Sequence, residues 1–106
     1  MARMKESVYW ILCALADGEA HGYAIAQRVA DLTGGQTTVG PGTLYATLER
    51  LVAEGLIEEA SSEIVDGRHR RNYRLAGSGR RVVIEETETR NAALLRARLA
   101  LGLGPA

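Results

Sequence analysis

Apolar residues recur at helical spacing from the start of the chain. In residues 5 to 17 they stand at i, i+3, i+4 and i+7, as on one face of a helix: Val8, Ile11, Leu12 and Leu15. The opposite face carries Trp10, Cys13 and Ala14, so this helix is apolar on nearly all sides. Because such a helix must be buried on all sides, we expect a second chain to cover the face that the monomer core leaves open.

Two further segments have the same periodicity. Residues 21 to 33 predict a second helix, which Gly34-Gly35 ends. Its apolar stripe consists of Ile25, Val29 and Leu32. Residues 41 to 54 predict a third helix that begins with proline, which the first position tolerates because its missing N–H would have no partner there. This helix has an apolar face, formed by Leu44, Leu48, Leu51 and Val52, and an opposite face with Thr43, Ala46, Thr47 and Arg50.

A β-hairpin is predicted after Gly55, which ends the third helix. A strand starts at residues 56–57, and a tight turn is predicted at Asp66-Gly67, a dipeptide that favours positive φ. Residues 71 to 75 alternate between two faces of the returning strand. Tyr73 and Leu75 fall on one face, Asn72 and Arg74 on the other.

A last helix is predicted over residues 79 to 101, in which Glu86 and Arg90 have i, i+4 spacing for an ion pair. Its thin apolar seam suits packing against a partner helix better than covering a core. We therefore predict that this helix and the first one form a dimer interface. The residues assigned to it are Trp10, Ala14, Val83, Thr87, Leu94, Ala97 and Leu101. The tail, residues 102 to 106, is expected to be frayed.

Composition places the chain among folded, single-domain proteins. Its 106 residues are 46% hydrophobic and 25% charged, and no apolar run reaches the roughly 20 residues that a membrane span needs. The first residues show no secretory signal, and the single Cys13 suits a reducing cytoplasm. Arginine supplies nearly all of the 13 basic residues, a bias typical of GC-rich bacterial genomes.

Charge is unevenly distributed although the formal net charge is zero. Six arginines lie between Ser61 and Arg81, against Glu63 and Asp66 alone. Residues 40 to 60 instead carry one arginine and four glutamates. A basic hairpin beside an acidic helix end is compatible with nucleic-acid binding, for which distribution matters more than the total.

The order of these elements predicts an α+β fold: a winged helix-turn-helix with an additional C-terminal dimerisation helix. In that fold the third helix enters the DNA major groove with its N-terminal residues, and the hairpin is the wing. Threonine methyl and hydroxyl groups can contact bases, and arginine binds phosphates or enters a narrow minor groove. The predicted DNA contacts are Gln36, Thr37, Thr38, Thr43, Tyr45, Thr47, Arg68, His69, Arg70 and Arg71. Residues 1–76 would be the DNA-binding domain, and 77–106 the dimerisation helix with its tail.

The segments HGYAIAQRV, PGTLYATLERLVAEGLI and GRHRRNYRL, in this spacing, resemble the PadR family of bacterial transcriptional regulators. The resemblance implies a winged-helix repressor that dimerises through its first and last helices and responds to a small effector. Some compact members bind flat aromatic or cationic drugs between subunits. The tryptophan they use in the last helix is absent here, so Tyr9, Trp10 and Cys13 are the expected effector contacts.

Two other departures from the family pattern concern Ala46, where proline is frequent, and Ala76, where threonine commonly caps the last helix. Ser78 is the alternative N-cap. A homodimer would place two recognition helices in successive major grooves about 34 Å apart, on an inverted-repeat operator in double-stranded DNA.

Other functions are poorly supported. The spacing from Gly35 to Gly40 lacks the lysine of a phosphate-binding loop, and His21 and His69 lie in different elements without an acidic cluster. We therefore expect no enzyme activity, cofactor or metal, and no membrane partner. A winged helix used only for protein–protein contact is the alternative, because the net charge is zero. A redox switch at Cys13 would require two subunits to bring their thiols together.

Overall fold

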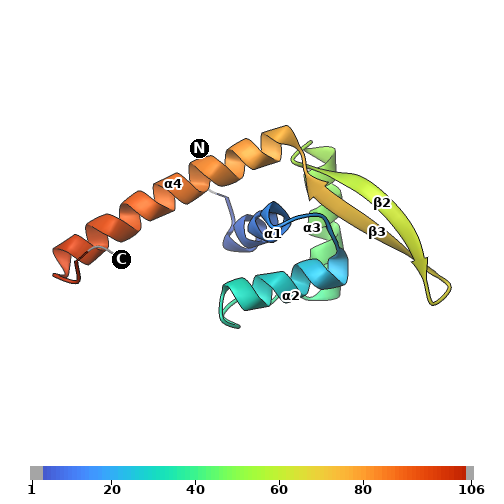
Figure 1. Ribbon diagram of the computed structural model, residues 1–106, viewed down its shortest axis with the longest axis horizontal. Coiled ribbons are helices and arrows are strands. Elements are labelled where there is room, and N and C mark those ends of the chain that lie inside the picture. Colours follow the sequence, from blue (N-terminus) through green and yellow to red (C-terminus); the bar gives the residue numbers. More distant parts are fainter. Residues whose placement is uncertain (1–3, 105–106) are drawn as a thin grey trace.

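Four helices and a three-stranded antiparallel sheet make up residues 4–104, the part of the chain that the computed structural model describes (Figure 1). The elements are α1 (Glu6–Ala16), β1 (Ala20–His21), α2 (Gly22–Leu32), α3 (Pro41–Ala53), β2 (Ile57–Val65), β3 (Arg68–Leu75) and α4 (Gly77–Ala100). The sheet order is β1-β3-β2. The winged helix-turn-helix with an additional C-terminal helix, predicted from the sequence, is confirmed.

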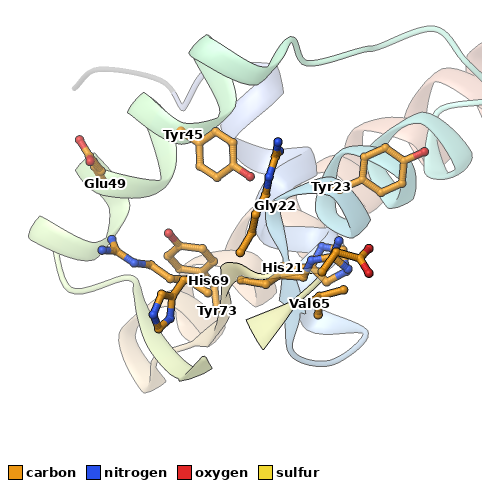
Figure 2. Close-up of a pocket in the computed structure, with 12 residues that line it drawn as sticks. His21, Gly22, Tyr23, Tyr45, Glu49, Val65, His69 and Tyr73 are labelled. Carbon is orange, nitrogen blue, oxygen red and sulfur yellow. The ribbon is translucent and has the colours of Figure 1, made fainter. Parts of the chain in front are cut away.

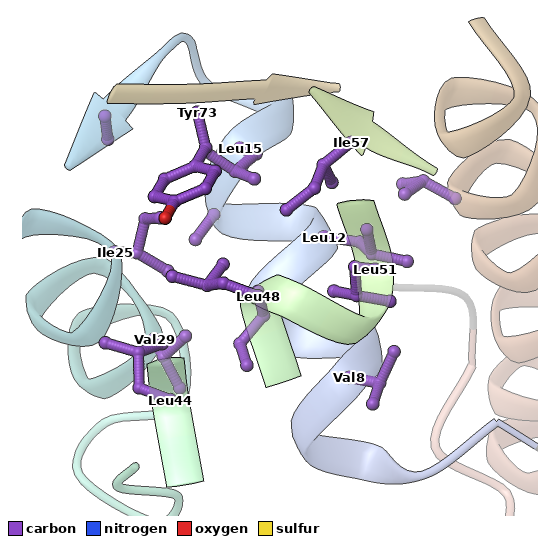
Figure 3. Packing of buried hydrophobic residues seen from close by; sticks show 14 residues of the cluster. Val8, Leu12, Leu15, Ile25, Val29, Leu44, Leu48, Leu51, Ile57 and Tyr73 are labelled. Atoms are coloured by element: carbon purple, nitrogen blue, oxygen red, sulfur yellow. The ribbon is translucent and has the colours of Figure 1, made fainter. Parts of the chain in front are cut away.

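The core lies where the first three helices meet the sheet (Figure 3). Periodic apolar residues of α1, α2 and α3 point into it, and the sheet contributes Ile57 and Tyr73. The largest fully buried side chains are Ile11, Leu12, Ile25, Val29, Leu48, Leu51 and Ile57. Burying one such side chain contributes roughly 1.5–3 kcal/mol, so this cluster holds α3 and the sheet in a fixed relation.

Two turns set the direction of the chain, one before the wing and one at its tip. After α3, Gly55 adopts φ 77°, and the amides of Gly55 and Leu56 donate to the carbonyls of Val52 and Leu51. This arrangement satisfies the last carbonyls of the helix. At the tip of the wing, Asp66 and Gly67 have φ 51° and 75°, as the sequence predicts for this dipeptide.

Two residues placed on apolar faces prove to be exposed. Leu32, at the end of α2, is 52% exposed, and Val52 of α3 is also exposed. Each lies in the last turn of its helix, where the helix has moved away from the core. The predicted stripes are therefore correct except at their C-terminal ends.

β1 was not predicted. It is a two-residue strand that pairs with β3, with Ala20 opposite Tyr73 and His21 opposite Asn72. Two residues are too few to show the alternation that identifies a strand in a sequence. The predicted two-stranded wing is therefore part of a three-stranded sheet, and His21 belongs to β1 and caps α2 instead of lying inside the helix.

α4 starts at Gly77, two residues before the predicted boundary, with Ala76 at the N-cap. The hydroxyl of Ser78 donates to the carbonyl of Gly55 at 2.6 Å instead of capping the helix, so the predicted cap is wrong. Gly79 packs so closely on the backbone carbonyl of Leu56 that a Cβ there would overlap it. These contacts fix the first turns of α4 on the body, from which the rest of the helix projects (Figure 1).

The middle of α4 is attached to α1 through Arg90 and Thr87. The Arg90 guanidinium lies 3.8 Å from the ring centroid of Tyr9 and 2.7 Å from the carboxylate of Glu6. It also forms the predicted i, i+4 pair with Glu86. Thr87 shares a 2.8 Å hydrogen bond with the Tyr9 hydroxyl. Thr87 and Arg90 of α4 therefore contact α1 of the same chain.

Two expected interface residues belong to the monomer core. Ala14 has no exposed surface and Val83 is buried, and both are part of the core cluster of one chain. In this conformation neither residue offers a surface to a second chain. Thr87, Leu94, Ala97 and Leu101 remain exposed, and Trp10 is half-buried.

The tail after α4 is held by Arg98, which donates to the carbonyls of Leu103 and Gly104. Residues 102–104 are thus more ordered than predicted, and 105–106 lie outside the described residues, as do 1–3 of the N-terminal segment. Among residues 4–104 no helix has both the length and the apolar character to cross a membrane.

Candidate nucleic-acid interface

The outward face of α3 is the first part of the candidate interface. Leu44, Leu48 and Leu51 bury the opposite face in the core. Thr43 and Tyr45 are exposed and Thr47 is half-buried. Gly40 caps the helix without a side-chain hydrogen bond, so first-turn N–H groups remain available to an acceptor from outside. The structure therefore presents the predicted α3 residues on one accessible face.

The loop before α3 is partly fixed. The amide of Thr37 donates to Oγ1 of Thr33 at 3.0 Å, and the Thr33 hydroxyl contacts the carbonyl of Thr37. Gln36 and Thr38 are exposed, while Thr37 is half-buried. The side chains of Gln36 and Thr38 are thus better placed for an external contact than that of Thr37.

Some basic residues of the wing form ion pairs with glutamates and others do not. Arg71 lies 3.5 Å from a carboxylate oxygen of Glu59, and Arg74 lies 2.7 Å from one of Glu58. Arg68 and Arg70 take part in none of the ion pairs found within residues 4–104. The uncompensated positive charge of the wing is therefore concentrated near its tip.

A groove of about 690 Å³ connects the wing, α3 and the start of α2 (Figure 2). Tyr45 and Glu49 of α3 line one side, and the basic end of β3 lines the other. Its charged and titratable lining is predominantly basic: Arg68, Arg70, Arg71, His21 and His69, against the carboxylates of Glu49 and Asp66. All four predicted wing contacts and Tyr45 thus meet at one groove.

Tyr45 lies at the junction of α2 and α3. Its side chain is 51% exposed, and its hydroxyl points at Gly22 (Figure 2). A Cβ on Gly22 would lie 2.7 Å from that hydroxyl oxygen, closer than real Cβ contacts permit. Gly22 therefore leaves the space that the Tyr45 ring occupies.

His21 is a groove residue that sequence reasoning missed. The sequence analysis considered it only as a metal ligand, whereas its Nδ1 accepts the amide of Ala24 at 3.3 Å and caps α2. Its Nε2 lies 3.4 Å from Nη1 of Arg70. Burial and then the Arg70 guanidinium lower the pKa of His21. His21 is the first residue of the predicted helix, and histidine is not among the preferred N-cap residues, so no signal in the sequence indicates this role.

The expected effector contacts adjoin one another but line no common cavity within residues 4–104. Tyr9 is only 5% exposed, Arg90 covers its ring, and Trp10 packs edge-on against it at 5.1 Å between centroids. Tyr9 is therefore unavailable for stacking on a ligand in this conformation. Cys13 lines a separate cavity of about 470 Å³ between α1 and α2, which neither aromatic residue lines.

Burial raises the pKa of the Cys13 thiol, and a protonated thiol is a poor nucleophile. No group of three or more His, Cys, Asp or Glu residues within 4–104 could hold a metal ion.

The sequence matches a family model described as the transcriptional regulator PadR-like family, over residues 11–85. A curated relative, the transcriptional regulator Rv3488 of Mycobacterium tuberculosis, is 44% identical over 92 residues. That alignment covers 87% of this chain and 79% of the relative.

Solved structures agree with this match. Bacillus subtilis PadR, in complex with operator DNA, has a TM-score of 0.70 and 26% identity; the match covers 80% of this chain and 48% of that one. The RosR protein of H. salinarum has a TM-score of 0.70 and 25% identity, covering 92% of this chain and 88% of that one.

Proposed function

The chain belongs to the PadR-like family of transcriptional regulators, and on that premise we propose that it binds operator DNA as a homodimeric repressor. The observation that carries this proposal is the groove where Tyr45 of α3 meets Arg68 and Arg70 of the wing, neither of which forms an ion pair within residues 4–104. The B. subtilis relative is described in complex with operator DNA, which supports DNA as the ligand of the same elements here.

In this proposal α3 enters the major groove with its N-terminal half. Thr43 and Thr47 would contact base edges or thymine methyls, and the first-turn N–H groups of α3 would donate to a phosphate. Glu54, which pairs with Arg50 at 3.3 Å, lies at the far end of the helix. That placement keeps its negative charge away from the DNA backbone.

The wing supplies most of the electrostatic attraction. Glu58 and Glu59 already compensate Arg74 and Arg71, so Arg68 and Arg70 are the residues we assign to phosphates. Each phosphate contact releases counterions, and log affinity should fall with log salt at a slope of about −0.9 per contact. The wing therefore determines how strongly binding depends on salt.

The second copy of the chain is proposed to pack on α4. Beyond Arg90 this helix carries exposed apolar side chains with no cover: Leu94, Leu95, Leu99 and Leu101, followed by Leu103. Such a concentration of exposed apolar side chains is rare on a protein that stays monomeric. We keep the division into a DNA-binding domain, 1–76, and a dimerisation helix with its tail, 77–106, as part of this proposal.

An effector, of small aromatic or hydrophobic type, would bind at the dimer interface near Trp10 and change the separation of the two α3 helices. It can act only through different affinities for the DNA-binding and non-binding states.

We place the protein in the cytoplasm, because a bacterial transcriptional regulator must reach the chromosome. We assign it no catalytic role.

Fluorescence anisotropy with the DNA upstream of the protein's own gene, across a salt series, tests the proposal. We expect tight binding to that duplex, with two subunits per site, and much weaker binding to a scrambled duplex. Equal, weak affinity for both would favour a winged helix that contacts only proteins.

The double substitution R68A/R70A tests the wing. It should weaken binding to both duplexes and reduce the magnitude of the salt slope by about 2 per subunit, because two phosphate contacts are lost. R80A/R81A is the matched control: it removes the same charge from exposed positions on α4, outside the groove. If both double variants change the slope equally, the wing has no special role.

A further inference from the structure

His21 connects the first turn of α2 to the wing through both of its ring nitrogens. Nδ1 accepts the amide of Ala24 at 3.3 Å, and Nε2 lies 3.4 Å from Nη1 of Arg70. A neutral imidazole has one nitrogen with a free lone pair and one that carries a proton. If Nδ1 accepts the cap bond, the proton is on Nε2. This N–H and the Arg70 N–H then face each other as two donors, and neither donates to a protein acceptor within residues 4–104.

The other protonation states do not resolve the conflict. With the proton on Nδ1, Nε2 can accept from Arg70, but the amide of Ala24 loses its cap. With both nitrogens protonated the cap is also lost, and two cations lie next to each other. Each state leaves one of these N–H groups without a protein acceptor, and because the contact is exposed, water takes that place in the free protein. A phosphate oxygen near both side chains can replace this water as the acceptor.

We propose that His21 and Arg70 together bind one backbone phosphate of the DNA. This inference rests on the proposed function and adds to it a contact outside α3 and the wing strands. One phosphate oxygen would accept from Nε2–H of His21, and the same or a second oxygen would accept from the Arg70 guanidinium, as a charge-assisted bond. Both residues line the groove beside Tyr45, so this phosphate would lie between the contacts of α3 and those of the wing tip.

The charges around His21 predict the direction in which DNA affinity should change with pH. In the free protein Arg70 and, more weakly, Arg28 oppose its protonation, while Glu63 of β2 favours it. A bound phosphate places negative charge beside the ring and favours the imidazolium, in which Nε2–H still donates to the phosphate while Nδ1 gives up the cap to Ala24. DNA binding therefore raises the pKa of His21 relative to the free protein. DNA binding then takes up a proton. Affinity is greatest at low pH and is lost as the pH rises through the pKa of the bound state.

The test measures DNA affinity between pH 5.5 and 8 at fixed salt. Between the free and bound pKa values, the linkage predicts up to about a tenfold loss of affinity per pH unit for each His21 engaged. H21N is the informative variant, because asparagine is a good N-cap and preserves the Ala24 bond. It should bind more weakly at pH 6 than the wild type and lose most of the pH dependence.

H69N is the matched control. It removes the other histidine of the groove. The fall in DNA affinity between pH 5.5 and 8 should remain in this variant, even if its affinity at any single pH differs from that of the wild type. The thermal midpoint of each variant, measured alone, checks that H21N is folded.

The outcomes separate the two proposals. A wild type that binds no duplex specifically at any pH overturns the proposed function. Specific binding with the same pH profile in H21N and wild type, or a profile that disappears only in H69N, overturns the phosphate contact. Loss of the profile in H21N alone supports it.

Discussion

Single residues in this protein determine how closely α2 and α3 can approach. Gly22 begins α2, and the Tyr45 ring of α3 fills the space that any larger residue at position 22 would need. The same contact positions the exposed part of Tyr45 at the groove. A substitution at either residue would therefore affect both the helix junction and the surface proposed to bind DNA.

G22A should destabilise the fold by about 1 kcal/mol, the low end of what overpacking costs, because the half-exposed Tyr45 ring can swing away from the added methyl group. Thermal or urea denaturation measures this change, and DNA affinity should fall with it. The double variant G22A/Y45A is the control: with the ring removed, the added methyl group meets no obstacle. The two substitutions should be non-additive, with G22A costing little in the Y45A background. An equal cost of G22A in both backgrounds would show that Tyr45 is not the obstacle.

At the scale of elements, the joint between α4 and the body depends on close backbone approach. Gly79 of α4 packs on the carbonyl of Leu56, which is also the acceptor for the amide of Ala76. The start of α4 is therefore fixed to the end of α3 and the beginning of β2, beside the hydrogen bond from Ser78 to Gly55. The direction of α4, and with it the geometry of a dimer, is determined at this joint.

G79A should lower the thermal midpoint clearly, because a methyl group at this position would overlap backbone that has little freedom to move. The expected cost is about 2 kcal/mol or more. G77A is the matched control: it lies in the same first turn, and a Cβ there meets nothing within 4 Å. Because alanine favours helix over glycine, G77A should be neutral or slightly stabilising. A similar destabilisation by both variants would refute the role given to the Leu56 contact.

Element order and most helix boundaries could be predicted from the sequence because they depend on local signals. Apolar periodicity, Pro41 at the start of α3 and the Asp66-Gly67 turn each act within a few residues. β1 could not be predicted, because its two residues are extended only through pairing with β3.

The candidate site was predictable only in part for the same reason. The exposed α3 residues and the basic wing follow from periodicity and charge. The role of His21 depends on Arg70, 49 residues away in the chain, and the pairing of Arg71 and Arg74 with glutamates depends on strand register. Contacts of this range leave no local pattern in the sequence.

The whole molecule is elongated, about 55 × 27 × 21 Å, with the wing and the end of α4 at opposite extremes (Figure 1). The proposed DNA contacts lie at one end and the uncovered leucines of α4 at the other. This separation allows one chain to bind a half-site and a second chain at the same time. The tight attachment of α1 to α4 through Tyr9 and Arg90 would transmit a change at the dimer interface to the body that carries α3.

The last prediction concerns this arrangement. Leu94 and Leu101 occur at i, i+7 spacing in the predicted interface and are 53% and 72% exposed, so L94E/L101E places two charges on one face without disturbing the core. Buried in a dimer interface, these charges would have no partner and would cost several kcal/mol. Sedimentation analysis should therefore show a monomer where the wild type is a dimer.

The same variant should lose about 10²- to 10⁴-fold in affinity for a full inverted repeat, because the two half-sites are no longer linked. Affinity for an isolated half-site should change little, since α3 and the wing are intact. N91E, which adds a charge at an exposed polar position of α4, should leave both properties as they are. A variant L94E/L101E that remains dimeric with an unchanged thermal midpoint would place the interface elsewhere. A wild type that is monomeric at the concentrations that saturate DNA would remove the homodimer from the proposal.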